Sequence, residues 1–407
     1  MARHAPLASL WLAFTLASVA AAQSSQETES PLAISLVTIG PGGAVWERFG
    51  HNMLRVRGGE EQLDRVWDWG RFSFDTERFF VRFAQGDLRY WMQGADGEGV
   101  VGWYANTGRT VAEQRLALSP AQAGQLLEFL RWNDTDEHRY YQYHYYNDNC
   151  STRIRDALDA VLGGALRART DTVVTRWSYR EATKRLNQHN PILYFGLTTL
   201  LASSTDKKMT GWEEMFLPGG LAHWVRELTV IGPDGGTRPL VEAETVIAAG
   251  GSFPIPGEPS RWWPGFLVLG VLIGGLLTAT GRSRSGARRL FLPAAVLYAL
   301  GAGVLGLVMA LLWVVSGHEV AWRNENLWQF NLVALALVPM LPAAMRGGGP
   351  RAGAALSLAR IIVGCSVLGV LLKLLPVFNQ ANWDVIVLAL PANVGLLLGV
   401  LGARSEK

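Results

Sequence analysis

Cysteine is scarce in this chain of 407 residues, which has only Cys150 and Cys365. Scaffolds held by several disulfides, and zinc sites built from repeated cysteine pairs, are therefore excluded. Cys365 lies inside a long apolar run, whereas Cys150 lies in a segment of mixed polarity. Cys150 is thus a single thiol in its own part of the chain, with no local partner for a disulfide.

The chain also lacks a strong charge of either sign. Its 37 Lys and Arg residues and 34 Asp and Glu residues give a net charge of +3. This excess is too small for the basic surface that binds nucleic acid, so we expect no nucleic-acid partner.

Apolar residues are abundant in the second half of the chain. Each of five runs is long enough to cross roughly 30 Å of hydrocarbon, which predicts an all-α bundle of about five transmembrane helices over residues 265–403 and a tail at 404–407. The runs are residues 262–280, 290–317, 327–345, 356–378 and 385–403.

The cationic residues between these runs predict the orientation. Loops rich in Lys and Arg remain in the cytoplasm. The loops on the other side hold only Arg323, so we expect a multi-pass protein of a bacterial inner membrane, with a periplasmic amino-terminal domain and a cytoplasmic carboxyl terminus. The residues expected inside are Arg282, Arg284, Arg288, Arg289, Arg346, Arg351, Arg404 and Lys407.

The first residues have the pattern of a secretory signal peptide. Arg3 precedes an apolar core at residues 7–19, and Ala20 to Ala22 form a small-residue cleavage site. We expect a signal peptide at 1–22 and a mature chain from Gln23, with an uncleaved anchor as the alternative. No cysteine follows the cleavage site directly, so the protein is not expected to be a lipoprotein itself.

Residues 23–250 have the mixed composition of a folded domain, and a linker rich in glycine and proline follows at 251–264. Alternating strand-like runs precede helix signals, which predicts an α+β domain. Asp75 is expected to cap a helix that ends at Gly86, and Ser119 to cap another. The expected strands are residues 33–39, 51–56, 65–69 and 110–118.

Cys150 is expected in the first turn of a helix capped by Asn149 or Asp148. Free backbone N–H groups there stabilise a thiolate and can hold an oxyanion. His51 follows a glycine at the start of a strand and is the candidate base. The alternatives are a buried apolar role for Cys150 and a solvated loop position for His51.

Two other sets of polar residues, a pair of histidines and the polar loops between the apolar runs, are possible sites. His138 and His144 have no cysteine or carboxylate at a matching spacing, so we expect no metal and no cofactor. The outer loops between the apolar runs are rich in polar groups that are either substrate contacts or solvated turns. The candidate contacts are His318, Asn324, Asn326 and Asn382.

Four blocks of the sequence together resemble the Lnb amino-terminal periplasmic domain family, in the same order along the chain. The resemblance covers most of residues 32–230, and four spaced blocks make it specific. The blocks are RFGHNMLRV (48–56), VWDWGRFSF (66–74), RTVAEQRL (109–116) and NCSTRIRD (149–156).

The resemblance implies a fold of the permuted papain type, similar to NlpC peptidases and lecithin retinol acyltransferase, in which the histidine precedes the cysteine. A polar residue on the strand after the histidine strand then orients the imidazole. Asp68 is the first choice and Asp64 the second. Asn149 is a candidate oxyanion donor.

Arg153 is a further candidate for the substrate site. It either binds a phosphate or pairs with Asp156 on the same helix.

The function that the resemblance implies is N-acylation of bacterial lipoproteins. Cys150 would take an acyl group from a membrane phospholipid as a thioester, His51 would act as base, and the amine of a lipoprotein would accept the group. The alternatives are a thiol hydrolase of the envelope with the same residues, acting as an amidase, peptidase or thioesterase, and a binding or sensory protein with a structural thiol.

Overall fold

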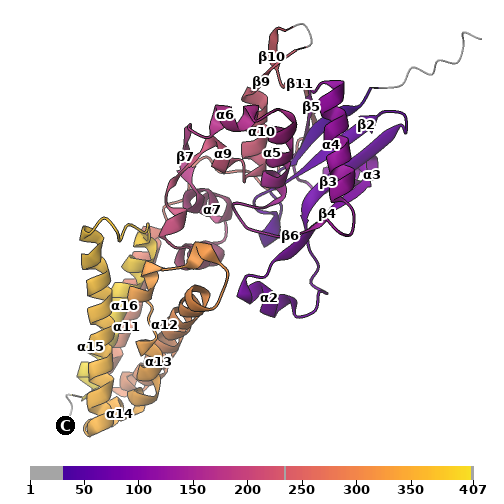
Figure 1. Cartoon of the computed structure of the whole chain (residues 1–407). Coiled ribbons are helices and arrows are strands. Elements are labelled where there is room, and N and C mark those ends of the chain that lie inside the picture. Colours follow the sequence, from indigo (N-terminus) through magenta and orange to yellow (C-terminus); the bar gives the residue numbers. More distant parts are fainter. Residues whose placement is uncertain (1–30, 233–234, 405–407) are drawn as a thin grey trace, which may run out of the picture.

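The computed structural model describes residues 31–232 and 235–404. It consists of a sheet domain formed by the first part of the chain and a helical bundle formed by the last part, with a layer of short helices between them (Figure 1). The expected signal peptide at 1–22 and residues 405–407 of the expected tail lie outside the described residues.

The domain is built on a sheet of seven strands in the order β11-β5-β1-β2-β3-β4-β6, in which every pair is antiparallel. The α+β architecture that the sequence predicted is confirmed, and the first expected strand matches β1 at both ends. The strands are β1 (Ala33–Ile39), β2 (His51–Gly58), β3 (Leu63–Arg71), β4 (Arg89–Asp96), β5 (Val111–Leu116), β6 (Tyr140–Gln142) and β11 (Val241–Ala248).

Both faces of the central strands are buried, as their continuous apolar sequences predict. Leu36 and Leu54 pack on one face with Ile154 of α5, and Val37 and Met53 pack on the other in a smaller cluster. Since successive side chains of a strand point to opposite faces, helices cover the sheet on both sides. These helices are α3 (Gly97–Ala105), α4 (Pro120–Asn133), α5 (Cys150–Val161) and α10 (Pro218–Glu227).

Two of the expected helix starts have different outcomes. Ser119 caps α4 as predicted, and its hydroxyl accepts the N–H of Gln122. Asp75 does not cap a helix, because it lies in a turn in which its N–H binds the Ser73 hydroxyl. Helix α2 (Phe79–Gln85) begins later, after Arg78 in a left-handed conformation, and ends at Gly86 as predicted.

Short elements fill the space between the sheet and the bundle and extend the domain at its far end (Figure 1). Helices α7 and α8 pack against each other, and α8 also contacts α16 of the bundle. These elements are α6 (Ala165–Thr170), β7 (Val174–Ser178), α7 (Tyr179–Asn187), α8 (Pro191–Leu200), β8 (Lys208–Thr210), α9 (Gly211–Glu214), β9 (Thr229–Ile231) and β10 (Thr237–Pro239).

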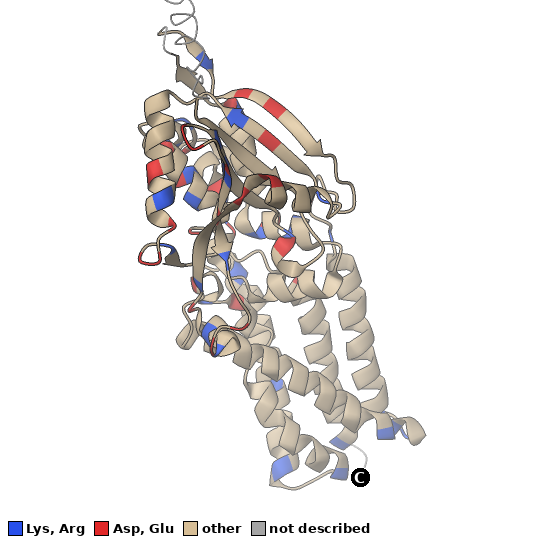
Figure 2. Ribbon diagram, turned by 90° about the vertical axis from the view of Figure 1, so that its right-hand side faces the viewer, with Lys and Arg blue, Asp and Glu red and all other residues tan. Residues whose placement is uncertain are grey.

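The carboxyl-terminal part contains five helical segments long and apolar enough to cross a membrane, as predicted. The third is broken into α13 and α14, because Pro339 and Pro342 have no N–H to continue the helical hydrogen bonds. Lys and Arg gather at the end of the bundle away from the sheet domain (Figure 2). The helices are α11 (Trp263–Gly281), α12 (Phe291–Val314), α13 (Val333–Leu337), α14 (Leu341–Arg346), α15 (Pro350–Leu371) and α16 (Trp383–Arg404).

Helices α11 and α16 approach each other closely along their length. A Cβ added to Gly274 would lie 2.4 Å from the Pro391 carbonyl, and one added to Gly270 would lie 2.4 Å from the Leu388 carbonyl. Only glycine permits this contact of two backbones, which is the usual way that membrane helices pack without a polar core.

The outer-loop asparagines are buried, so the expectation that they contact substrate is wrong for this structure. The Asn324 side chain donates to the carbonyls of Thr199 and Leu200 at 2.8 and 2.9 Å, and Asn326 donates to Thr199 at 2.8 Å. Asn382 donates to Asn326 at 2.8 Å. The last carbonyls of a helix have no partner within it, so these amides complete the carboxyl end of α8.

Ion pairs reinforce this joint between the domain and the bundle. Lys184 of α7 lies 2.7 Å from Asp384 at the start of α16. Glu325, which lies between Asn324 and Asn326 in the chain, pairs with Lys373. Breaking a buried pair by removing one partner costs about 3–5 kcal/mol, because the other charge is left uncompensated. The two parts of the chain are therefore held in a fixed relative position.

Candidate active site

The start of α5 brings Cys150 against the central strands β2 and β3. His51 is the first residue of β2, Asp68 lies within β3, and Cys150 is the first residue of α5. Gly70 lies beneath the thiol with φ +94°, and a Cβ there would be 3.6 Å from the Cβ of Cys150. Residues that are about one hundred positions apart in the sequence thus meet at one point of the sheet.

The carboxylate of Asp68 holds the imidazole of His51. The Nε2 atom of His51 lies 2.7 Å from Oδ2 of Asp68, and the Asp68 side chain is only 4% exposed. The other oxygen of Asp68 accepts a hydrogen bond from Nε of Arg71 at 2.8 Å. Asp64, the second choice from the sequence, is bound instead to Arg55 at 2.6 and 2.7 Å.

The thiol of Cys150 is more acidic than an ordinary cysteine. Burial raises its pKa, but the charge of His51, a hydrogen bond with His51 and the backbone N–H of Asn52 lower the pKa by more. A thiolate, and not a thiol, is the nucleophilic form of cysteine. The surroundings of Cys150 therefore favour its reactive form.

The imidazole of His51 shows the opposite shift. Burial lowers its pKa, but the charge of Cys150 and hydrogen bonds to Asp68 and Cys150 raise the pKa of His51 well above its usual value. For Asp68, burial raises the pKa, while the hydrogen bond and charge of His51, together with Arg71, leave its pKa below the usual range. These shifts favour the charged form of each of the three groups, compared with the same residue in water.

A chain of buried hydroxyl and amide groups fixes the first turn of α5 to the sheet. The Ser151 hydroxyl donates to Oδ1 of Asn52 at 2.8 Å, and Nδ2 of Asn52 donates to the Thr38 hydroxyl at 2.8 Å. Ser151 and Asn52 are both fully buried. These hydrogen bonds therefore fix the position of the first turn of α5 relative to strand β2.

Asn149 caps the helix as predicted, but its amide does not face the thiol. Its Oδ1 accepts the N–H groups of Ser151 and Thr152, and its Nδ2 donates to the carbonyls of Tyr145 and Phe216 at 3.0 Å. All its hydrogen-bonding atoms are used to hold the turn. Of the first N–H groups of α5, only that of Cys150 has no acceptor within the described chain.

Arg153 has a structural partner, although not the one expected. Its Nη2 atom donates to Oδ2 of Asp148 at 2.7 Å, and its guanidinium lies 4.3 Å from the ring centre of Tyr141. Asp156 pairs with Arg155 at 2.8 Å. The expected pair between Arg153 and Asp156 is therefore wrong, and Arg153 joins the loop before the helix to the helix itself.

Two residues of the site were missed from the sequence. Arg71 stands three positions after Asp68 in the same block, residues 66–74, but nothing in the pattern indicated its pairing. Tyr141 is 9% exposed, and its hydroxyl has no hydrogen-bond partner among the described residues. A Cβ atom added to Gly70 would lie 4.0 Å from this hydroxyl and 3.6 Å from the Cβ of Cys150.

His318 lies away from the thiol, in the loop after α12. Its Nε2 lies 2.7 Å from the Phe83 carbonyl, and its Nδ1 lies 3.5 Å from the Tyr145 hydroxyl. Tyr145 in turn binds Asn149 through its carbonyl. His318 therefore connects this end of the bundle to α2 and to the loop that precedes Cys150, and both of its ring nitrogens lie close to polar groups of the chain.

The fold and this cluster define a multi-pass membrane protein whose α+β domain holds a buried cysteine, histidine and aspartate. Residues 22–185 match the family model of the Lnb N-terminal periplasmic domain. The match includes all three residues and confirms the resemblance seen in the sequence for this region. No curated protein and no solved structure matches the chain, and the relation to NlpC-like enzymes stays a prediction.

The shifted pKa values predict how Cys150 reacts with iodoacetamide. At about pH 6 an ordinary thiol, with a pKa of about 8.5, is protonated and slow to react. We expect Cys150 to be alkylated readily at that pH in a Cys365→Ala background. His51→Ala removes the cationic imidazole but leaves Cys150 buried. Alkylation of Cys150 in this variant should therefore require a higher pH than alkylation of an ordinary thiol.

The matched control is His223→Ala, which removes an exposed histidine of α10. Its pH profile should equal that of the parent protein. Identical profiles for His51→Ala and the parent would contradict the assigned interaction between His51 and Cys150.

Proposed function

We propose that this protein is a cysteine-dependent acyltransferase of the bacterial inner membrane, which passes an acyl chain from a phospholipid to the amine of a lipoprotein. The observation that carries the proposal is a buried cluster of Cys150, His51 and Asp68, in which the pKa of the thiol is lowered, in a domain joined to a bundle of five apolar helices. Lipid substrates lie in the bilayer, and the fixed joint to the bundle keeps the thiol near them.

In the first half-reaction the Cys150 thiolate attacks an ester carbonyl of the phospholipid. A carbon–sulfur bond forms, the carbon–oxygen bond of the ester breaks, and the leaving alkoxide takes the proton of the His51 imidazolium. The products are a thioester on Cys150, a lysophospholipid and a neutral imidazole.

In the second half-reaction an amine attacks the thioester carbonyl. A carbon–nitrogen bond forms, the carbon–sulfur bond breaks, and neutral His51 takes the proton of the amine. The thiolate and imidazolium are restored, and the acceptor carries a new amide. Asp68, held by Arg71, keeps the imidazole oriented through both steps and stabilises its charged form.

The Cys150 N–H and the Tyr141 hydroxyl are the groups proposed to hold the oxyanion of both tetrahedral intermediates. Both donors lie near the thiol and neither has an acceptor in the described chain. A buried donor without a partner costs about 1–3 kcal/mol, which an oxyanion would offset in the transition state.

The proposed membrane orientation follows from the charge distribution. The arginines of the inner loops and of the carboxyl end lie at the bundle end opposite the sheet domain (Figure 2). Because such loops remain in the cytoplasm, we propose that the sheet domain and Cys150 lie in the periplasm. The resemblance to Lnb supplies the acceptor, the free α-amine of the lipid-modified cysteine of an apolipoprotein or lysolipoprotein.

The direct test is acyl transfer by full-length protein in phospholipid vesicles to a lipid-modified cysteinyl peptide with a free amine, followed by mass spectrometry. We expect the peptide to gain one acyl chain with the parent protein and with the Cys365→Ala control. Cys150→Ala should lose the transfer by at least about a thousandfold, since no thioester can form.

Undiminished transfer by Cys150→Ala would overturn the thioester mechanism. Release of fatty acid or cleavage of an amide, with no acyl gain by the peptide, would identify the protein as a hydrolase that uses the same residues.

Tyr141→Phe tests the oxyanion donor separately. Loss of such a donor typically lowers kcat by about 10²–10³, so we expect a fall of this size. The pH profile of Cys150 alkylation should not change, because alkylation forms no oxyanion. Tyr140→Phe alters a neighbouring tyrosine that is 45% exposed and should retain the parent rate; equal rates in both variants would exclude the role of Tyr141.

A further inference from the structure

Helix α2 exposes large apolar side chains although it belongs to the sheet domain. Phe80 is 75% exposed, Val81 is 54% exposed and Phe83 is 40% exposed. Single exposed apolar residues are common on protein surfaces, but a group of three on one short helix marks a contact with another apolar phase.

The position of α2 identifies that phase as the bilayer. The Gln85 carbonyl accepts the N–H of Gly317 at 2.7 Å, directly after α12 ends at Val314. The Phe83 carbonyl binds His318 in the same loop. The outer end of α12 is itself exposed and apolar, so the lipid-facing surface of a span continues onto α2. The exposed residues there are Trp313, Val314 and Val315.

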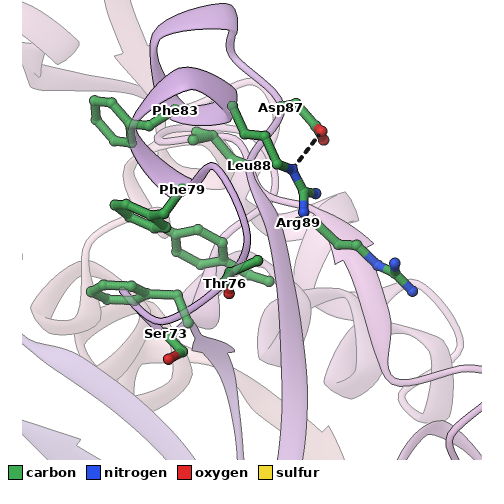
Figure 3. A pocket seen from close by; sticks show the side chains of 10 residues that line it. Ser73, Thr76, Phe79, Phe83, Asp87, Leu88 and Arg89 are labelled. Carbon is green, nitrogen blue, oxygen red and sulfur yellow. Dashed lines mark hydrogen bonds and ion pairs between the residues drawn. The ribbon is translucent and has the colours of Figure 1, made fainter.

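A hollow opens between α2 and the edge of the sheet (Figure 3). The space within it that a water-sized group can occupy is about 20 Å³, so the hollow is shallow. Phe72, Phe79, Phe83, Leu88 and Tyr90 supply its apolar walls. A surface lined mainly by aromatic rings suits a hydrocarbon chain.

The charged residues of the hollow stand apart from these rings. Figure 3 shows Phe79 and Phe83 on one side, with Asp87 and Arg89 on the other. Arg82 donates to Asp87 at 2.8 Å, so this carboxylate is already neutralised. The charges thus leave the aromatic side of the hollow free for an apolar occupant.

Stacked rings lead from the hollow to the thiol. The ring of Phe72 stacks on Tyr90 at 5.1 Å between centres, and Tyr90 stacks on Tyr143 at 4.4 Å. A Cβ atom added to Gly70 would lie 4.0 Å from the ring of Tyr143 and 3.6 Å from the Cβ of Cys150. A stack of aromatic rings therefore links α2 to the site.

We propose that α2 dips into the outer leaflet and that its exposed apolar side chains, with the aromatic rim of the hollow, contact one acyl chain of the phospholipid donor. This proposal rests on the proposed function and names the part of the protein that selects and admits the donor. Apolar faces of interfacial helices insert to the depth of the acyl chains in this way, and the loop after α12 holds α2 at that depth.

The test is photocrosslinking of the full-length protein in vesicles of phosphatidylethanolamine and phosphatidylglycerol. The probe is a phosphatidylethanolamine with a diazirine in one acyl chain. After illumination and digestion, mass spectrometry should find crosslinks in the peptide that covers residues 72–90. Cys150→Ala should give the same crosslinks, because binding at α2 precedes the chemistry.

Phe80→Asp with Val81→Asp should reduce these crosslinks by at least about fivefold, since charges are costly in the hydrocarbon region. Phe80→Ser with Val81→Ser, a milder change at the same exposed positions, should reduce them in the same direction. The matched control is Ile231→Asp, which places a charge at an exposed apolar position of β9, far from the bundle (Figure 1); it should change nothing.

Crosslinks confined to the membrane spans, or equal yields in the parent and the aspartate variant, would overturn the proposal. Crosslinks at residues 72–90 in a protein that fails the acyl-transfer assay would support the lipid site and reject the proposed reaction, so the two failures are distinguishable.

Discussion

The central constraint on this molecule is the cost of keeping a charged pair in a buried place. Each of Cys150 and His51 favours the charged form of the other, which lowers the pKa of the thiol and raises the pKa of the imidazole. Asp68 binds the imidazole from behind, and Arg71 holds the other oxygen of Asp68. Much of the surrounding fold supplies the hydrogen bonds and the glycine that let these groups approach.

The joint between the domain and the bundle serves the same site from another direction. From the sequence, the asparagines of the polar loops between the spans were expected to be accessible. In the structure these asparagines are buried, and their hydrogen bonds complete the carboxyl end of α8. His318 extends this joint to α2 and, through Tyr145, to the loop before Cys150. Anchoring and reactivity are thus properties of one connected structure, and a change in a bundle loop can reach the thiol.

Much of this architecture was predictable from local signals. Apolar length gave the five spans, alternation gave the strands, and a small polar residue before an apolar helix placed Cys150 at a helix start. His51 was a candidate base for Cys150 from the residues themselves, whereas the role of Asp68 was expected only through the family resemblance. Arg71 could not be predicted, because residues three apart in a regular strand point to opposite faces, and an irregularity in the β3–β4 pairing between Asp68 and Arg71 brings them together. Tyr141 could not be predicted, because its position beside Cys150 depends on tertiary packing that no local pattern encodes.

The most direct test of the account is to look for the acyl thioester itself. Full-length protein in phospholipid vesicles, with no amine acceptor, should gain the mass of one acyl chain. Hydroxylamine at neutral pH should remove this mass, and peptide mapping should place it on Cys150. A protein that stays unmodified while it acylates an added amine, or an acyl group found on another residue, would contradict the account.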